Sequence, residues 1–213
     1  MLKKARFLGW LTTPLILALC SPVNASELLR FQVYLGDKPI GQHSFRITEN
    51  DNVTRVTSRA SFDVDFLFFN AYRYRHDSRE VFRNGCLQEI RATTDDNGTK
   101  YRVEGEAIGG DFRIAREDGK EQANGCLMTF AYWDPAFLNQ DRLLNAQTGK
   151  LEPVRVARKG GDRVVVGDRE VQARRYALSA DELNIDLWYN DDLGWVGLAS
   201  DTGKGGRLVY RRM

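Results

Sequence analysis

The chain has 213 residues, of which 42% are hydrophobic and 28% are charged, and 31 Lys and Arg against 29 Asp and Glu give a net charge of +2. A chain of this length can bury a sizeable core within one domain. The nearly balanced charge argues against a nucleic-acid-binding protein, which normally carries a strongly basic surface. We therefore expect a globular domain and no nucleic-acid partner.

Residues 1–25 have the three regions of a secretory signal peptide. Residues 3–6 form a basic start, residues 7–19 are mainly apolar, and Val23-Asn24-Ala25 places small residues where a signal peptidase reads. The apolar stretch is shorter than the roughly 20 residues that span a bilayer. We expect cleavage after Ala25, no transmembrane anchor after processing, and a single mature domain, residues 26–213, in a bacterial periplasm. A retained membrane anchor is the alternative.

Cys20 offers a second alternative, because a lipoprotein signal also ends at a cysteine. Leu19 is a poor fit to the small residue expected before such a cysteine, so lipidation at Cys20 is the minor alternative. Removing residues 1–25 takes away three basic residues and no acidic one, which leaves 28 basic against 29 acidic residues and a net charge of −1. The weak positive charge of the whole chain therefore says nothing about the partners of the mature domain.

Two cysteines remain after this cleavage, and both lie in the same tetrapeptide, Asn84-Gly85-Cys86-Leu87 and Asn124-Gly125-Cys126-Leu127. An even number of cysteines in an oxidising compartment favours a disulfide. A Cys86–Cys126 bridge would close a loop of about 40 residues, worth about 4 kcal/mol in the chain-entropy model. Two free buried thiols are the alternative.

Short segments of alternating apolar and polar residues, separated by turn residues, predict β-strands along the whole mature chain. In chain order they are residues 31–35, 40–47, 53–64, 86–94, 101–107, 112–115, 121 onward, 163–166, 171–178, 183–189, 195–199 and 208–211. Asp96-Asn97-Gly98 is a strong signal for a tight hairpin turn. Strands this close together favour an antiparallel meander over β-α-β units.

One helix is predicted after the first group of strands. Asp134 can cap its start and Pro135 suits its first turn. Phe137 and the pair Leu143-Leu144 would share one face, and the helix should end near Ala146. The predicted fold is therefore all-β: one strongly curved antiparallel meander sheet, an open barrel or clam, with one short helix packed against it.

Catalytic signatures are mostly missing from this sequence. It has no nucleophile elbow, P-loop, dinucleotide-binding glycine motif or His-Glu-x-x-His motif. His43 and His76 are the only histidines, and neither has a metal partner at a useful spacing. We therefore predict a protein that is not an enzyme and that needs no cofactor or metal. The alternative is an envelope hydrolase that uses His76 with a carboxylate such as Asp77 and a distant nucleophile.

Aromatic residues are abundant and fall in three bursts along the chain. They suit the core of a curved sheet, and the alternative is a groove for an apolar or amphiphilic ligand. Alternation fails at Phe66-Leu67-Phe68-Phe69, because four successive apolar residues cannot all point inward from a strand. The candidate ligand-binding residues are Phe66, Phe68, Phe69, Tyr72, Trp133, Trp188 and Trp195.

The sequence also resembles a known group of proteins. The strand, small turn and second strand over residues 31–41 resemble the start of exported bacterial domains of unknown function. One such proteobacterial family is similar over nearly the whole mature chain, through Tyr132-Trp133, residues 143–149, 186–189, 195–198 and 208–210. This resemblance implies an all-β envelope protein, distantly like the open half-barrels that carry lipoproteins through the periplasm. It implies no activity, because a fold alone does not define a function.

Export, abundant aromatic residues and the absence of a catalytic motif together favour one function. We expect a non-catalytic periplasmic binding or accessory protein of the cell envelope, which holds an apolar small molecule or lipid on a concave sheet or contacts an envelope protein. A purely structural interaction module is a further alternative, and an exposed apolar lip at residues 66–69 would favour it.

Overall fold

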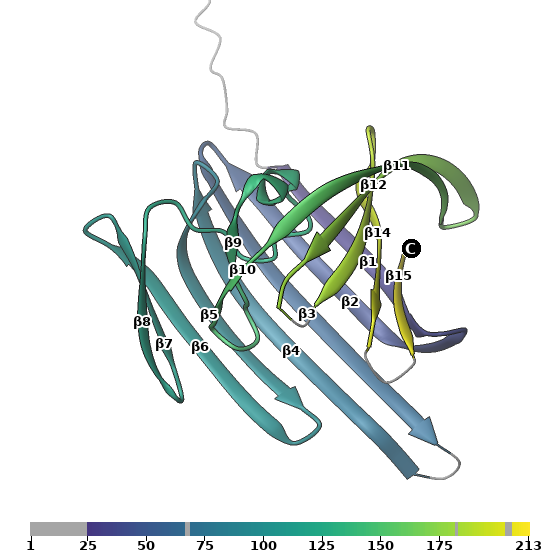
Figure 1. Ribbon diagram of the computed structural model, residues 1–213, viewed down its shortest axis with the longest axis horizontal. Helices are drawn as coiled ribbons and strands as arrows, with labels where there is room; N and C mark the ends of the chain where they lie inside the picture. The colour runs from purple at the N-terminus through teal and green to yellow at the C-terminus, as the bar shows by residue number, and fades with distance from the viewer. Residues whose placement is uncertain (1–24, 67–68, 182, 203–205) are drawn as a thin grey trace, which may run out of the picture.

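The computed structural model describes residues 25–66, 69–181, 183–202 and 206–213 (Figure 1). The expected signal peptide lies almost entirely outside the described residues, so cleavage after Ala25 and lipidation at Cys20 stay predictions. Phe68 and the side chains of Phe66 and Phe69 lie outside them as well. Within the part that is described, we find no helix with the length and apolar character needed to cross a bilayer.

Strands account for most of the described chain. In chain order the elements are β1 (Ala25–Leu35), β2 (Lys38–Asn50), β3 (Val53–Phe66), β4 (Phe69–Arg83), β5 (Cys86–Asp96), β6 (Thr99–Ile108), β7 (Asp111–Arg116), β8 (Gly119–Asn124), the 3-10 helix η1 (Pro135–Asn139), β9 (Arg142–Leu144), β10 (Leu151–Pro153), β11 (Arg155–Val166), β12 (Arg169–Ser179), β13 (Asn184–Asn190), β14 (Gly194–Asp201) and β15 (Arg207–Arg212).

Thirteen strands form one antiparallel sheet in the order β11-β12-β13-β14-β15-β1-β2-β3-β4-β5-β6-β7-β8. The first strand therefore lies inside the sheet, where β1 pairs with both β2 and β15. Strands β8 and β11 form the two edges, so the described sheet curves without closing into a barrel (Figure 1). The prediction of a strongly curved, open antiparallel meander is confirmed.

The tight hairpins follow from turn chemistry that the sequence shows. Asn97 and Gly98 connect β5 to β6 with φ angles of 51° and 95°, and Asn84 and Gly85 connect β4 to β5 with 50° and 77°. Two successive positive φ angles are typical of the two-residue turns whose twist matches that of the flanking strands. The hairpin predicted at Asp96-Asn97-Gly98 is therefore confirmed.

The apolar core is centred where β1 joins the two halves of the sheet. Phe31 and Val33 of β1 are fully buried, and Trp195 of β14 is 1% exposed. The Trp195 ring lies 4.1 Å from the ring of Phe31 and 5.3 Å from that of Phe45 on β2, measured between centroids. Aromatic side chains of β1 and β2 thus pack against one from β14, which lies on the other side of the β1–β15 pairing.

Between β8 and β11 the chain leaves the main sheet and lies against its inner face. We call residues 125–154 the crossing segment; it contains η1, β9 and β10 (Figure 1). Its fully buried side chains include Leu127, Met128, Phe137, Leu143 and Leu144. The crossing segment therefore fills most of the concavity that the curved sheet creates.

The helix in the crossing segment is shorter than predicted. Asp134 caps it by accepting a hydrogen bond from the Ala136 N–H at 2.9 Å, and Pro135 lies at its start, as expected. The helix is a 3-10 turn that ends at Asn139, so the predicted end near Ala146 was wrong. Leu143 and its neighbour instead form β9, because protein covers both faces of this short strand and two successive apolar residues can be buried there.

Strand β11 is longer than predicted, because it begins at Arg155 rather than near Arg163. Its pairing with β12 shifts between Arg158 and Gly160, and Gly160 has a φ of 108°. Such a bulge interrupts the alternation of side chains along a strand. The sequence pattern consequently reveals only the part of the strand that follows the bulge.

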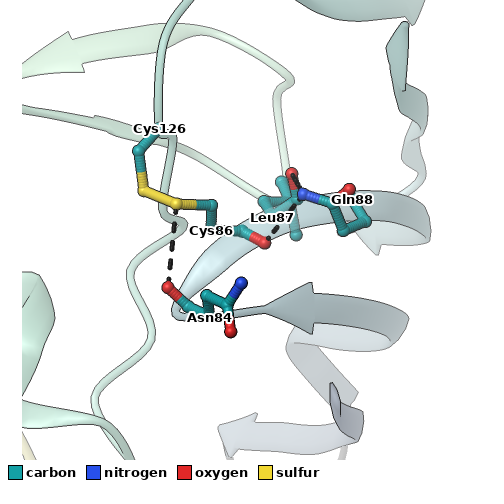
Figure 2. The surroundings of a disulfide bond; sticks show 5 residues. All are labelled: Asn84, Cys86, Leu87, Gln88 and Cys126. Atoms are coloured by element: carbon teal, nitrogen blue, oxygen red, sulfur yellow. Dashed lines mark hydrogen bonds between the residues drawn. A yellow bond between two sulfur atoms is a disulfide. The ribbon is translucent and has the colours of Figure 1, made fainter. Parts of the chain in front are cut away.

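The predicted disulfide is present: Cys86 and Cys126 are bridged, with their Cα atoms 5.0 Å apart (Figure 2). Cys86 is the first residue of β5, whereas Cys126 lies at the beginning of the crossing segment. Beside the bridge, the Leu87 N–H donates a hydrogen bond to the Leu127 carbonyl oxygen at 2.8 Å. The bridge therefore determines where the crossing segment enters the concave face.

Replacing both cysteines, with Cys86→Ser and Cys126→Ser, should lower the free energy of unfolding by up to about 4 kcal/mol, because the unfolded chain regains the freedom of a 40-residue loop. Urea denaturation followed by tryptophan fluorescence measures the loss. Reduction of the wild-type protein serves as the control and should lower the stability similarly. An unfolding midpoint equal to that of the oxidised wild type would contradict this prediction.

Candidate functional site

A cleft of about 280 Å³ remains between the crossing segment and the inner face of the sheet. Its lining residues are His43, Phe45, Val56, Ser58, Tyr74, His76, Ser78 and Glu80 from the sheet, residues 129–133 and 145–147 from the crossing segment, and Leu183 and Tyr210. The concave face is thus largely packed, yet it retains a hollow. A larger hollow on the outer face is bordered mainly by charged residues, which is typical of a solvated strand surface.

Strand β4 supplies more polar residues to the cleft than any other strand. Side chains alternate between the two faces of a strand, so every second residue of β4 faces inward. The inward series reads Tyr72, Tyr74, His76, Ser78, Glu80 and Phe82. Five polar or amphipathic residues therefore precede the first purely apolar one on a face that is otherwise built for the core.

The register of the sheet places the two histidines in one row. His43 on β2 lies opposite Ala60 on β3, Ala60 lies opposite His76 on β4, and His76 lies opposite Thr94 on β5. Only the methyl group of Ala60 stands between the two imidazoles in this row. The small side chain of Ala60 leaves room for both imidazole rings on the inner face of the sheet.

His43 is held by three neighbours. Its Nε2 lies 2.7 Å from Ser58 Oγ, its Nδ1 lies 3.2 Å from the Tyr210 hydroxyl, and its ring stacks on Phe45 at 4.1 Å. Burial, assisted by the nearby His76, lowers the pKa of His43 to about 3. The imidazole is therefore neutral at neutral pH.

His76 has one occupied and one open ring nitrogen. Its Nδ1 lies 2.8 Å from Thr94 Oγ1, and its Nε2 forms no hydrogen bond with any residue that the structure describes. Burial lowers the pKa of His76 to about 4, although the Asp77 charge acts in the opposite direction. The open nitrogen belongs to a neutral ring in the wall of the cleft.

Glu80 connects β4 to the crossing segment. It is 7% exposed, and its two carboxyl oxygens accept hydrogen bonds from Ser78 Oγ at 3.0 Å and from Thr129 Oγ1 at 2.7 Å. Burial raises the pKa of Glu80, while these two hydrogen bonds oppose the rise. Thr129 thus fixes the crossing segment onto a carboxyl group that burial shifts toward its neutral form.

A second set of hydrogen bonds lies at the end of the cleft where Tyr72 and Tyr74 are placed. Tyr74 donates to Gln147 Oε1 at 2.9 Å, Gln147 Nε2 donates to Asp96 at 3.2 Å, and Tyr72 donates to Asp96 at 2.8 Å. Burial raises the pKa of both tyrosines, so they remain phenols that donate. This network attaches residues 145–147 to β4 and β5.

The predicted ligand-binding residues do not form one group. Trp133 lines the cleft, with its ring 5.3 Å from that of Phe82, and Tyr72 belongs to the network at its end. Trp195 lies in the core directly behind the cleft lining, with its ring 5.3 Å from those of Phe45 and Tyr132. Trp188 lies on the outer face, where its Nε1 donates to Asp162 at 2.8 Å. The structure thus brings Trp133 and Tyr72 to this region, places Trp195 behind the cleft wall, and turns Trp188 to the outer face.

The proposed pairing of His76 with Asp77 is not formed. Consecutive residues of β4 face opposite sides of the sheet, and the outward Asp77 accepts a hydrogen bond from Arg59 Nε at 2.8 Å. Nor do the described residues include a cluster of three or more His, Cys, Asp or Glu side chains placed to bind a metal ion.

Sequence reasoning missed most of the polar groups in the cleft, namely His43, Ser58, Ser78 and Glu80. A signal for them was available in the alternation. His43 and Ser58 occupy inward positions beside the apolar Phe45 on β2 and Val56 on β3, whereas Ser78 and Glu80 continue a polar inward series on β4. Polar residues at core positions are a stronger indicator of a site than an abundance of aromatic residues.

Comparisons with known proteins agree with this architecture. A family model described as a domain of unknown function (DUF6134) matches residues 31–213. Among solved structures, the chain is similar to the crystal structure of a β-barrel-like protein of domain of unknown function DUF1849 from Brucella abortus, with 10% sequence identity and a TM-score of 0.61 over 91% of this chain and 98% of that chain. None of the curated proteins matches. The expected resemblance to an uncharacterised all-β family is confirmed, and at this identity the structural likeness shows the fold alone.

The free energy of unfolding should depend on pH in one direction because of the two histidines and in the opposite direction because of Glu80. Folding lowers the pKa of His43 and His76, so the unfolded chain binds more protons below about pH 6.5 and stability falls as the pH decreases toward 4. Folding raises the pKa of Glu80, so its contribution is lost as the pH rises above the unfolded value. Urea denaturation between pH 4.5 and 7.5 measures the net slope.

We expect His76→Gln to reduce the pH dependence of the free energy of unfolding at low pH, by an amount equivalent to the uptake of up to one proton on unfolding. Glu80→Gln should make this pH dependence steeper, because it removes the contribution that opposes the histidines. The two substitutions thus act as controls for each other. Equal pH slopes for wild type and both variants would show that these groups titrate alike in the folded and unfolded chain.

Proposed function

We propose, for a chain that belongs to the DUF6134 family of domains of unknown function, that it is a non-catalytic binding protein of the bacterial cell envelope. The site is the cleft on the concave face, and the ligand is a small amphiphilic molecule. One observation carries the proposal: aromatic and apolar walls enclose a row of polar groups, in which Glu80 is buried and His43 and His76 are half-buried. Pockets of this composition typically bind small molecules.

The size of the cleft narrows the class of ligand. Its volume of about 280 Å³ is at the lower end of ligand pockets, which run from about 300 to 1,000 Å³. The crossing segment fills the remaining concavity with side chains such as Leu143 and Phe137. These features favour a small molecule over the acyl chain of a lipid.

The compartment is part of the same proposal. The Cys86–Cys126 disulfide favours an oxidising environment, as does the composition of residues 1–25, which is typical of a signal peptide. A periplasmic location after cleavage at Ala25 agrees with both features. A purely structural module would be favoured by an apolar lip at residues 66–69, whose side chains lie outside the described part of the chain.

A hydrolase is the second candidate, because His43 Nε2 lies 2.7 Å from Ser58 Oγ, within the range of a base and its nucleophile. Two features argue against it. The other ring nitrogen of His43 faces the Tyr210 phenol, where a catalytic triad has a carboxylate. Burial also lowers the pKa of His43 to about 3, so the imidazole is a weak base at neutral pH.

Treatment of the oxidised protein with a fluorophosphonate probe should therefore leave Ser58 unlabelled, as measured by intact mass and peptide mapping. Ser78→Ala provides a matched control, since Ser78 lies in the same cleft and donates to Glu80 instead of meeting a histidine. Stoichiometric labelling that Ser58→Ala abolishes and Ser78→Ala retains would establish the hydrolase and overturn the non-catalytic function.

Binding itself is tested by native mass spectrometry of the exported protein after incubation with a total extract of its cell envelope. We expect a bound small molecule in the wild type, and its loss in Ala146→Trp, because Ala146 lines the cleft and an indole there fills it. Val165→Trp is the control, because Val165 is 51% exposed on β11 and does not line the cleft.

Wild-type protein that stays empty, or equal retention of the ligand by the Ala146→Trp and Val165→Trp variants, would contradict binding in the cleft. The same spectra give the intact mass of the exported chain. That mass distinguishes cleavage after Ala25 from a lipid attached at Cys20, and we expect the former.

A further inference from the structure

We propose that the cleft selects an uncharged ligand, namely a small aromatic or cyclic molecule with an amide, carbonyl or hydroxyl group, and discriminates against anions and cations of the same shape. The inference rests on the proposed binding function and adds the chemical class of the ligand. It follows from which charged and polar groups the cleft contains, and from which of them are already occupied.

The described lining offers no cationic partner to an anion. The described lining of the cleft contains no lysine or arginine, from either the sheet or the crossing segment. Arg75 of β4 faces the other side of the strand from His76 and binds Asp63 at 2.7 Å. A carboxylate or phosphate in the cleft would therefore lose its hydration without gaining a cationic partner, and burial of an unpaired ion is strongly unfavourable.

A cation would meet a carboxyl group whose oxygens already accept hydrogen bonds. Glu80 is the single carboxyl group in the described lining, and hydroxyl groups of Ser78 and Thr129 occupy both of its oxygens. Two carboxyl groups just outside the described lining are engaged as well. Asp96 accepts hydrogen bonds from Tyr72 and Gln147, and Glu152 accepts one from Asn145 at 2.6 Å. A cationic ligand would have to displace one of these partners.

The titratable groups that face the cleft are also predominantly uncharged. Burial lowers the pKa of both His43 and His76, so both rings are neutral at neutral pH. Tyr74, Tyr132 and Tyr210 have raised pKa values because they are buried, and they remain phenols. Ring nitrogens and phenols form hydrogen bonds with a neutral ligand at no electrostatic penalty.

Three polar atoms remain available to such a ligand. His76 Nε2, the Tyr132 hydroxyl and Trp133 Nε1 form no hydrogen bond with the residues described, and all three residues line the cleft. An imidazole nitrogen, a phenol and an indole N–H together match a group that both donates and accepts, such as an amide.

The apolar part of the ligand has a matching surface. Phe45 and Val56 of the sheet are buried beside the polar row, and Phe130 and Trp133 come from the opposite wall. A ring between these two walls would contact aromatic faces, while its polar substituent faces His76. The arrangement favours one flat ring with one polar group over a long chain.

Three probes of one shape separate charge from fit: benzamide is neutral, benzoate is an anion and benzamidine is a cation at pH 7.5. The oxidised mature protein is titrated with each, and nitrogen–hydrogen correlation spectra report both affinity and location. We expect benzamide to shift the signals of the Trp133 indole and of β4 around His76. Benzoate and benzamidine should bind at least about tenfold more weakly, because each would be buried without a counter-ion.

A charge placed in the wall should change this selectivity. Ala146 lines the cleft from the crossing segment, so Ala146→Lys introduces the cation that the wild type lacks. We expect benzoate to gain about tenfold or more relative to benzamide in this variant. Ala146→Met is the matched control for bulk, because it adds a side chain of similar length without charge. The difference between the Lys and Met variants in the ratio of benzoate to benzamide affinity therefore isolates the effect of charge.

The outcomes separate this inference from the proposed function. Benzoate or benzamidine binding the wild-type cleft as tightly as benzamide would overturn selection for an uncharged ligand and leave a binding cleft in place. An unchanged preference in a folded Ala146→Lys variant would overturn it as well. Absence of binding by all three probes would count against both the neutral-ligand inference and the cleft as a binding site.

Discussion

The attachment of the crossing segment to the inner face of the sheet is the constraint on which the rest of the structure depends. The Cys86–Cys126 bridge and the Leu87–Leu127 hydrogen bond set its point of entry, and Thr129 then meets Glu80 three residues later. An open sheet of this curvature would otherwise expose its apolar inner face to water, which is strongly unfavourable. The crossing segment covers that face and leaves the cleft as the part that it does not fill.

This attachment also accounts for the polar row. Burying an imidazole or a carboxyl group is unfavourable unless its hydrogen-bonding atoms are matched. His43 is matched within the sheet by Ser58 and by Tyr210, whereas Glu80 depends on Thr129 from the crossing segment. A core that served stability alone would have apolar residues at these positions. Polar residues at positions where the strand pattern places core residues are typical of functional sites. The proposed function is therefore assigned to the cleft and not to the core around Trp195.

The aromatic residues predicted from the sequence to bind a ligand lie in different parts of the structure. Trp133 and Tyr72 lie at or beside the cleft, but Trp188 is turned to the outer face, where Asp162 binds it. The alternation along β13 buries Ile185, Leu187 and Tyr189 and turns Trp188 outward, so the sequence pattern held a signal for this placement. Aromatic residues suit a core, an outer face and a ligand site equally, so their number alone does not locate a site.

The sequence by itself determined what depends on neighbours along the chain. Alternation predicted most strands, Asn97 and Gly98 predicted a hairpin because their backbone accepts positive φ angles, and the Cys86–Cys126 pair predicted the bridge. Only the tertiary structure decided the pairing of β1 with β15, the path of the crossing segment and the short length of η1. The physical reason is that turn geometry and side-chain alternation are local, whereas the face that a residue buries against depends on strands far away in the sequence.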